Sequence, residues 1–239
     1  MGGIIRCSQS KPGSHIDVAL IGDSHAEHLF LGLAEALPDK NVVYYIRGIP
    51  VRSVSGMDQI IDHVAPDPAI GTVILTAERV VRGVAQDELV KTLENFRSKG
   101  KAVFVTDDVP TFDFEAEACK YRIAPILPSP QCSEDRKLFD AAHATYSPQL
   151  RDAVSKVPGV QLLNTAEYFC DNSVCSMNKG EALLYRDTNH LNNIGSSVLS
   201  TGCLPTSPQF RAAVTWPSRP CPSQQPRAIF SRGQFKEMR

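Results

Sequence analysis

A short polar motif, GDSH, follows the first apolar run of the chain. It comprises Gly22, Asp23, Ser24 and His25 and stands between a strand-like run and a helix-like stretch. A serine at such a junction can cap the helix, and it can also attack an electrophile. The unpaired N–H groups and the dipole of a helix's first turn favour negative charge. Ser24 is therefore a candidate nucleophile whose own N–H would supply half of an oxyanion hole, although Asp23 and Ser24 would each also serve as a plain cap.

A second motif near the end of the chain supplies the base that a serine nucleophile requires. In DTNH, Asp187 and His190 are three residues apart and precede a final helix-like stretch. At this spacing the carboxylate can reach Nδ1 of the imidazole, which fixes the tautomer and leaves Nε2 free to take the serine proton. Taken alone, Ser24 is best interpreted as a helix cap and His190 as a solvated loop residue. Together the motifs predict a triad of Ser24, His190 and Asp187.

Apolar runs of strand length alternate with amphipathic stretches of helix length in this chain. The predicted strands are 16–21, 41–46, 72–76, 102–106 and 160–163, and the predicted helices are 25–37, 86–99, 136–154 and 192–199. This alternation predicts an α/β fold, a three-layer α/β/α sandwich with a parallel sheet, over residues 15–203. Ligands bind such sheets beyond the carboxyl ends of the strands. Ser24 stands directly after the first strand, at this edge.

Cysteines in local pairs mark excursions from the predicted sheet. Cys119 and Cys132 flank a proline-rich segment within residues 107–135, and Cys170 and Cys175 close the stretch CDNSVC. Short loops of this kind suit disulfides, which require an oxidising compartment. Unrelated buried thiols are one alternative. A zinc site is another, and it is disfavoured because the pairs lack a C-x-x-C spacing and a nearby histidine.

The composition excludes several functional classes. The 239-residue chain has a net charge of −1, which gives no general attraction to nucleic acid or to an anionic membrane. Its apolar runs are too short to span a bilayer, and its start lacks the apolar core of a secretion signal. Residues 204–239 are proline-rich and basic, and we predict a disordered tail there. Because the cysteines indicate export while no signal is visible, we expect a piece of a larger protein.

The paired motifs resemble blocks I and V of the SGNH (GDSL-like) hydrolase superfamily. GDSH and DTNH are most similar to the SGNH domains that follow acyltransferase-3 membrane domains in bacterial O-acetyltransferases, over about residues 15–200. The resemblance implies a flavodoxin-like sheet, Ser24 as nucleophile, His190 as general base and acid, and Asp187 as its orienting partner. It also implies work at the periplasmic, extracytoplasmic face of the inner membrane beside an acyltransferase-3 domain. No cofactor, metal or nucleic acid is expected.

The oxyanion hole of this superfamily is only partly represented. Its members complete the hole with a glycine after the second strand and an asparagine after the third. Gly48 fits the glycine position, with Gly56 as the fallback, but the stretch ERVVRG after the third strand contains no asparagine. The acyltransferase-linked branch often lacks this asparagine too. One missing donor can cost about 10²–10³ in rate, unless Arg79 or a backbone N–H replaces it.

The predicted activity is O-acyl transfer, with acetyl as the acyl group by resemblance. Ser24 would accept the acyl group, and a hydroxyl of an envelope glycan (O-antigen, capsule or peptidoglycan) would displace it with His190 as base. A stand-alone carbohydrate esterase uses the same triad and is the nearest alternative. A metal-dependent phosphoesterase with Asp23, His25 and His28 as ligands is disfavoured because its other ligands are missing. An inactive fragment of a membrane acyltransferase is the remaining alternative.

Overall fold

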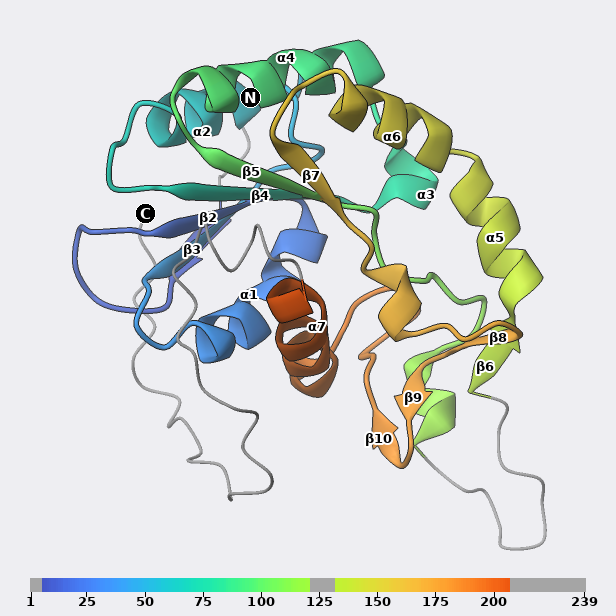
Figure 1. Cartoon of the computed structure of the whole chain (residues 1–239). Coiled ribbons are helices and arrows are strands. Elements are labelled where there is room, and N and C mark those ends of the chain that lie inside the picture. The colour runs from blue at the N-terminus through green and yellow to red at the C-terminus, as the bar shows by residue number, and fades with distance from the viewer. Residues whose placement is uncertain (1–5, 121–131, 207–239) are drawn as a thin grey trace, which may run out of the picture.

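A six-stranded, mostly parallel sheet forms the centre of the protein (Figure 1). The computed structural model describes residues 6–120 and 132–206. In spatial order the strands are β1 (Arg6–Gln9), β3 (Val42–Ile46), β2 (Val18–Gly22), β4 (Thr72–Thr76), β5 (Ala102–Thr106) and β7 (Val160–Leu163). The five strands after β1 are parallel to their neighbours and follow the 2-1-3-4-5 order of flavodoxin-like sheets. β1 pairs antiparallel with β3 and was not among the predicted strands.

Helices cover both faces of the sheet, which confirms the three-layer prediction. One face carries α1 (Ser24–Ala36) and α7 (Asn193–Thr206), and the other carries α2 (Met57–Val64), α4 (Gln86–Ser98) and α6 (Ser147–Ser155), as Figure 1 shows. Side chains of a strand alternate between the two faces. In β2, Val18 and Leu20 accordingly join the core under α1, whereas Ala19 and Ile21 join the core under α2. A strand buried on both faces explains why its sequence is continuously apolar.

The helix predicted over 136–154 is in fact two helices, α5 (Arg136–Ala144) and α6. Pro148 lies in the first turn of α6. Proline has no N–H, and its ring clashes with the carbonyl four residues earlier in a continuing helix. That residue is Ala144, where α5 ends. The chain turns at Tyr146, whose buried hydroxyl donates to the carbonyl oxygen of Asp107 at 2.8 Å.

The last helix is longer than predicted. The helix was predicted over 192–199, since Gly202 and Pro205 are unfavourable inside a helix, but α7 continues to Thr206. A Cβ atom at Gly202 would lie 2.4 Å from the ring of Tyr168. The glycine is therefore used for close packing against that ring rather than for a helix end. This helix packs on the sheet, beside α1.

The segment after β5 leaves the sheet and returns through small strands. It contains η1 (Ala116–Cys119) and β6 (Ser133–Asp135), and β6 pairs with β8 (Val174–Ser176). η2 (Ala166–Tyr168) follows β7, and β9 (Asn178–Lys179) pairs with β10 (Ala182–Leu183). The predicted disulfides Cys119–Cys132 and Cys170–Cys175 are both formed. Each disulfide closes a loop within its own segment, and the pairing of β6 with β8 attaches the excursion to the chain segment that leads into the DTNH motif.

Several elements lie outside the predicted set or outside the described residues. α2 and the single-turn helix α3 (Arg79–Arg82) were not predicted. The proline-rich part of the excursion at 121–131 is not described by the structure. Of the tail predicted over 204–239, residues 204–206 belong to α7, and the rest lies outside the described residues. Within the described ranges, no helix combines the length and apolar character needed to cross a membrane.

Candidate active site

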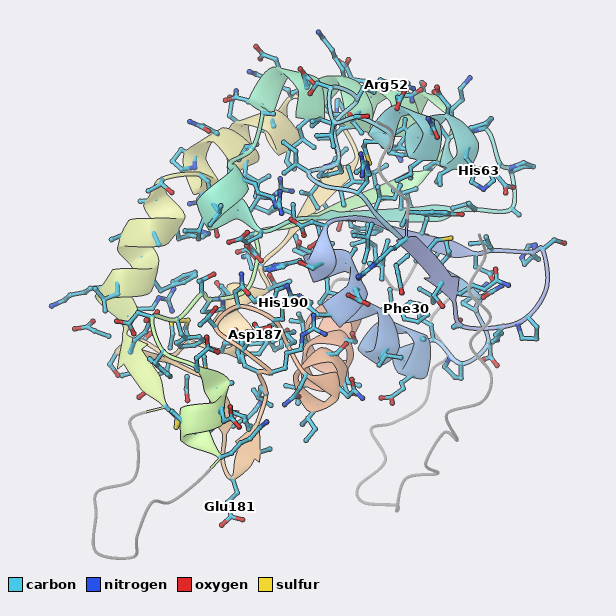
Figure 2. The ribbon with its side chains drawn as sticks, turned by 180° about the vertical axis from the view of Figure 1, so that it is seen from behind. Phe30, Arg52, His63, Glu181, Asp187 and His190 are labelled. Atoms are coloured by element: carbon cyan, nitrogen blue, oxygen red, sulfur yellow. A yellow bond between two sulfur atoms is a disulfide. The ribbon has the colours of Figure 1, made fainter. Side chains whose placement is uncertain are left out.

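The structure brings Ser24, His190 and Asp187 together from opposite ends of the chain. The Oγ atom of Ser24 lies 2.7 Å from Nε2 of His190. The other ring nitrogen, Nδ1, lies 2.9 and 3.0 Å from the two carboxylate oxygens of Asp187. Asp187 and His190 are labelled in Figure 2, in the loop that precedes α7. This is the serine–imidazole–carboxylate arrangement in which the imidazole accepts the serine proton and the carboxylate fixes the tautomer.

Asp187 is held in its ionised form. Its Oδ1 atom accepts the backbone N–H groups of Asn189 and His190 at 3.1 and 2.7 Å. Burial favours the neutral acid, but these two N–H donors and the His190 ring hold the pKa of Asp187 below its ordinary value. The carboxylate therefore stays charged at neutral pH and can stabilise an imidazolium at His190.

The nucleophile turn is fixed by Asp23. Its Oδ1 atom accepts the N–H of His25 at 3.0 Å and caps α1. Its Oδ2 atom accepts the N–H of Glu78 at 2.9 Å and lies 3.1 Å from Nε of Arg82. One buried carboxylate thus joins the start of α1 to the segment after β4 and leaves Ser24 at the first helical position. There the N–H of Ser24 has no preceding turn to donate to.

The residues of the phosphoesterase alternative have other partners. Asp23 accepts backbone N–H groups as described above. Nδ1 of His25 lies 2.6 Å from Oδ1 of Asp108, and Nδ1 of His28 accepts the N–H of Leu191 at 3.3 Å. Their positions are explained by hydrogen bonds within the protein, so the phosphoesterase alternative gains no support from the geometry.

Gly48, the glycine predicted for the oxyanion hole, lies beside the nucleophile turn. Its N–H donates to the carbonyl of Gly22 at 3.2 Å, and the N–H of Arg47 donates to the same oxygen at 2.8 Å. An oxyanion would therefore compete with the Gly22 carbonyl for the Gly48 donor. Gly56 has a positive φ of 86° and precedes α2, and its missing side chain leaves room for Arg47. The geometry of Gly56 is thus accounted for by a turn.

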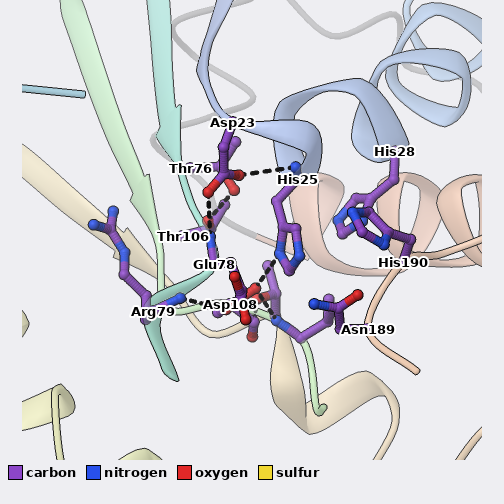
Figure 3. A network of polar contacts seen from close by, with 12 residues as sticks. Asp23, His25, His28, Thr76, Glu78, Arg79, Thr106, Asp108, Asn189 and His190 are labelled. Atoms are coloured by element: carbon purple, nitrogen blue, oxygen red, sulfur yellow. Dashed lines mark hydrogen bonds and ion pairs between the residues drawn. The ribbon is translucent and has the colours of Figure 1, made fainter. Parts of the chain in front are cut away.

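The side chain of Arg79 does not point toward the triad. Figure 3 shows its guanidinium directed away from His25 and His190. It is fully buried, and none of its three side-chain nitrogens has a hydrogen-bond partner in the described residues. Burial lowers the pKa of Arg79, although Asp108 and Asp23 oppose this shift. The contribution of this residue near the site is its backbone N–H, which donates to Oδ2 of Asp108 at 2.8 Å.

Asp108 was not among the residues predicted for the site. Asp107 and Asp108 follow β5 directly, at the same carboxyl edge of the sheet as Ser24. Two carboxylates after a buried parallel strand are a usable signal, because the ends of such strands converge on one rim. Asp108 holds His25 from this position, while Asp107 accepts the N–H and hydroxyl of Thr165 at 2.6 and 2.8 Å.

Residues 2–204 match the model of the SGNH domain that is fused to AT3 domains. The chain belongs to this SGNH family. It is accordingly an enzyme of the acyltransferase or ester hydrolase type. GDSH and DTNH, the motifs on which the resemblance was based, are the parts of the SGNH domain that meet at the triad.

A solved structure shows the same fold. The periplasmic domain of a lipopolysaccharide acetyltransferase from Salmonella ser. Paratyphi A matches with a TM-score of 0.62 at 20% identity, covering 80% of this chain and 82% of that one. The C-terminal catalytic domain of peptidoglycan O-acetyltransferase A from Streptococcus pneumoniae matches at 12% identity with a TM-score of 0.44, covering 85% and 94%. No curated protein sequence matches significantly.

Proposed function

We propose that this SGNH domain transfers an acetyl group to a hydroxyl of a cell-envelope glycan through an acyl-enzyme on Ser24. The observation that carries the proposal is the 2.7 Å contact between Ser24 Oγ and His190 Nε2, with Asp187 on the opposite ring nitrogen. The acetyl group and the glycan class are inferred from the membership in the AT3-fused SGNH family and from the lipopolysaccharide acetyltransferase with the same fold.

The first half-reaction acylates Ser24. Oγ of Ser24 bonds to the carbonyl carbon of the donor while Nε2 of His190 takes the hydroxyl proton. Nδ1–H of the resulting imidazolium is paired with Asp187, which stays charged. The tetrahedral intermediate then collapses, the bond to the donor's leaving group breaks, and His190 returns its proton to that leaving group.

The second half-reaction transfers the acyl group from Ser24 to the acceptor. His190 takes the proton of the acceptor hydroxyl, whose oxygen bonds to the acyl carbon. The acyl–serine bond then breaks, and Oγ of Ser24 recovers the proton from His190. With water as acceptor, the same steps release free acetate, so this triad also serves an esterase. Transfer requires the sugar hydroxyl to reach the acyl carbon before water does.

The developing oxyanion is assigned to backbone donors. The N–H of Ser24 lies in the first turn of α1, where the helix dipole favours negative charge. Gly48 is the proposed second donor, which would turn from the Gly22 carbonyl toward the oxyanion. A hole without the family's asparagine is consistent with a lower intrinsic rate, since one donor is worth about 10²–10³.

The proposed setting is extracytoplasmic. The disulfides Cys119–Cys132 and Cys170–Cys175 require an oxidising compartment, and the structural relative is a periplasmic domain. We propose that an integral-membrane acyltransferase-3 domain delivers the acyl group to Ser24, since the matching family is described as fused to AT3 domains. The glycan then takes the acyl group on the same side of the membrane.

A two-arm assay tests the proposal. The protein is given p-nitrophenyl acetate with and without an oligosaccharide of envelope glycan, and products are separated by mass spectrometry. An acetylated oligosaccharide that disappears in Ser24→Ala supports transfer. Acetate alone in both arms, also dependent on Ser24, assigns the esterase instead. Equal rates for wild type and Ser24→Ala in folded protein, with no labelling by a serine-directed phosphonate, would overturn both.

A further inference from the structure

A second imidazole–carboxylate pair lies beneath the catalytic one. Nδ1 of His25 is 2.6 Å from Oδ1 of Asp108, and both side chains are 1% exposed. The ring centroid of His25 is 5.1 Å from that of His190 and 4.5 Å from that of His28. Figure 3 shows the three rings close together at the start of α1. His25 immediately follows the nucleophile in the chain, so its ring is placed by the same turn that places Ser24.

Asp108 is held firmly in this arrangement. Its two carboxylate oxygens accept the N–H groups of Val109 and Arg79, each at 2.8 Å. Its backbone has a φ of 87°, in the left-handed region that side-chain-bearing residues rarely adopt. Such a conformation costs free energy and persists where surrounding contacts enforce it, commonly at functional sites. The carboxylate is thus aimed at His25 at the expense of local strain.

The charges around the ring favour a protonated His25. Burial alone lowers the pKa of His25, but Asp108, Asp23 and Glu78 together raise it above its ordinary value. These carboxylates come from the segment after β5, the start of α1 and the segment after β4. On its remaining sides His25 faces the rings of His28 and His190.

His28 is uncharged in the same cluster. It is buried, and burial, followed by the charges of His25, His190 and Arg186, puts the pKa of His28 well below its ordinary value. Beside His190 itself lie Asp187 and, next to it, Arg186, whose Nε is 3.7 Å from the Asp187 carboxylate. Among the three histidine rings, the buried positive charge is therefore at His25, next to the catalytic base.

We propose that His25, held by Asp108, is a positioning residue that keeps His190 unprotonated and ready to accept the serine proton. Asp187 attracts a proton to His190, and a cation in the neighbouring ring opposes this. Nε2 of His25 is buried and has no hydrogen-bond partner among the described residues, so its influence on His190 is through charge and packing. The inference rests on the proposed role of His190 as the base.

The size of the effect follows from the ring separation. A unit charge at about 5 Å, in an effective dielectric of about 20 to 80, changes a neighbouring pKa by about 0.6 to 2.4 units. A His25→Asn substitution removes the charge while its amide can still donate to Asp108. We expect the pKa of His190 to rise by about one unit. His28→Asn removes a neutral ring from the same cluster and should leave the pKa of His190 in place.

NMR titration of labelled histidine rings measures this directly and needs no turnover. A His190 pKa that is unchanged or lower in folded His25→Asn would overturn the proposal, as would an equal rise in His28→Asn. If His25→Asn does not fold, the double variant His25→Asn/Asp108→Asn leaves no unpaired charge buried. A smaller upward shift is expected there, because the Asp108 carboxylate that is also removed attracts a proton to His190. No rise in the double variant overturns the proposal as well.

An activity profile distinguishes this proposal from the proposed function. In p-nitrophenyl acetate hydrolysis, the acidic limb of kcat/KM should move to higher pH in His25→Asn, with the plateau retained within a few fold. A merely structural role would lower the plateau without moving the limb. If wild type shows no Ser24-dependent hydrolysis, the proposed function fails while the NMR result still decides the influence of His25 on His190.

Discussion

The N–H of Gly32 in α1 donates to Oγ of Ser196 in α7 at 2.9 Å, and no side chain separates the two helices at this point. A Cβ atom on Gly32 would lie 2.1 Å from the carbonyl oxygen of Ser196. α1 begins with Ser24, and α7 follows directly on the loop with His190. The approach of these two helices therefore sets the distance between nucleophile and base.

Gly32→Ala should damage both stability and activity. The added methyl group forces the two helices apart, which we expect to cost about 1–3 kcal/mol and to lower kcat more than it raises KM, because the Ser24–His190 contact lengthens. Thermal unfolding and steady-state kinetics measure the two effects. Gly71→Ala is the matched control, since nothing lies within 4 Å of a Cβ at Gly71. Equal behaviour of the two variants would contradict the proposed coupling.

Asp187→Asn should abolish most activity with little change in stability. The amide can still contact the ring, but it no longer secures the Nδ1–H tautomer or stabilises the imidazolium, which costs about 10⁴ in comparable triads. Rates of ester hydrolysis and of phosphonate labelling at Ser24 measure the loss. Retention of more than a tenth of wild-type kcat would show that Asp187 does not orient His190.

Removing Cys119–Cys132 should loosen the catalytic loop. The carbonyl of Cys132 accepts the N–H of Met177 at 2.9 Å. The carbonyl of Met177 in turn accepts the N–H of Leu184 at 2.8 Å, just before the loop that carries the DTNH motif.

The cysteines of this disulfide are separated by 13 in the sequence, so its loss should cost about 3 kcal/mol of stability. Cys170–Cys175, with a separation of 5, should cost about 2 kcal/mol. Denaturant unfolding of the paired Cys→Ser variants compares them. Equal costs, or activity unaffected in either variant, would show that the loop is positioned independently.

Glu134→Gln should stabilise the protein in a pH-dependent way. Burial, followed by repulsion from Asp113, raises the pKa of Glu134 from 4.5 to about 7. A carboxyl whose pKa is raised on folding stabilises the fold below its unfolded pKa and loses this contribution as pH rises through the folded value.

The Tm of Glu134→Gln should therefore exceed that of wild type at about pH 8, and the gain should vanish toward about pH 4. Differential scanning calorimetry across this range measures the effect. Glu117→Gln, at an exposed position, is the control. A gain that is the same at every pH would indicate that packing rather than charge is responsible.

Local pattern was sufficient for much of the fold and for the identity of the triad. β4, β5 and β7 have the predicted bounds, because strands buried on both faces must be continuously apolar. The GDSH and DTNH motifs named Ser24, Asp187 and His190 because the chemistry of acyl transfer requires these residue types. The cysteine pairs were likewise readable, since each closes a short local loop.

Long-range contacts decided the rest. β1 is polar enough to escape notice and becomes a strand only by pairing with β3. Gly202 is typical of a helix end in the sequence, but in the structure it leaves room for the ring of Tyr168. Asp108 is identified as part of the site only by its contact with His25, 83 residues away in the chain. The sequence by itself thus determined which residues are chemically competent. Only the tertiary structure decided which of them share a site, because that depends on helices α1 and α7 meeting at a distance that no local pattern specifies.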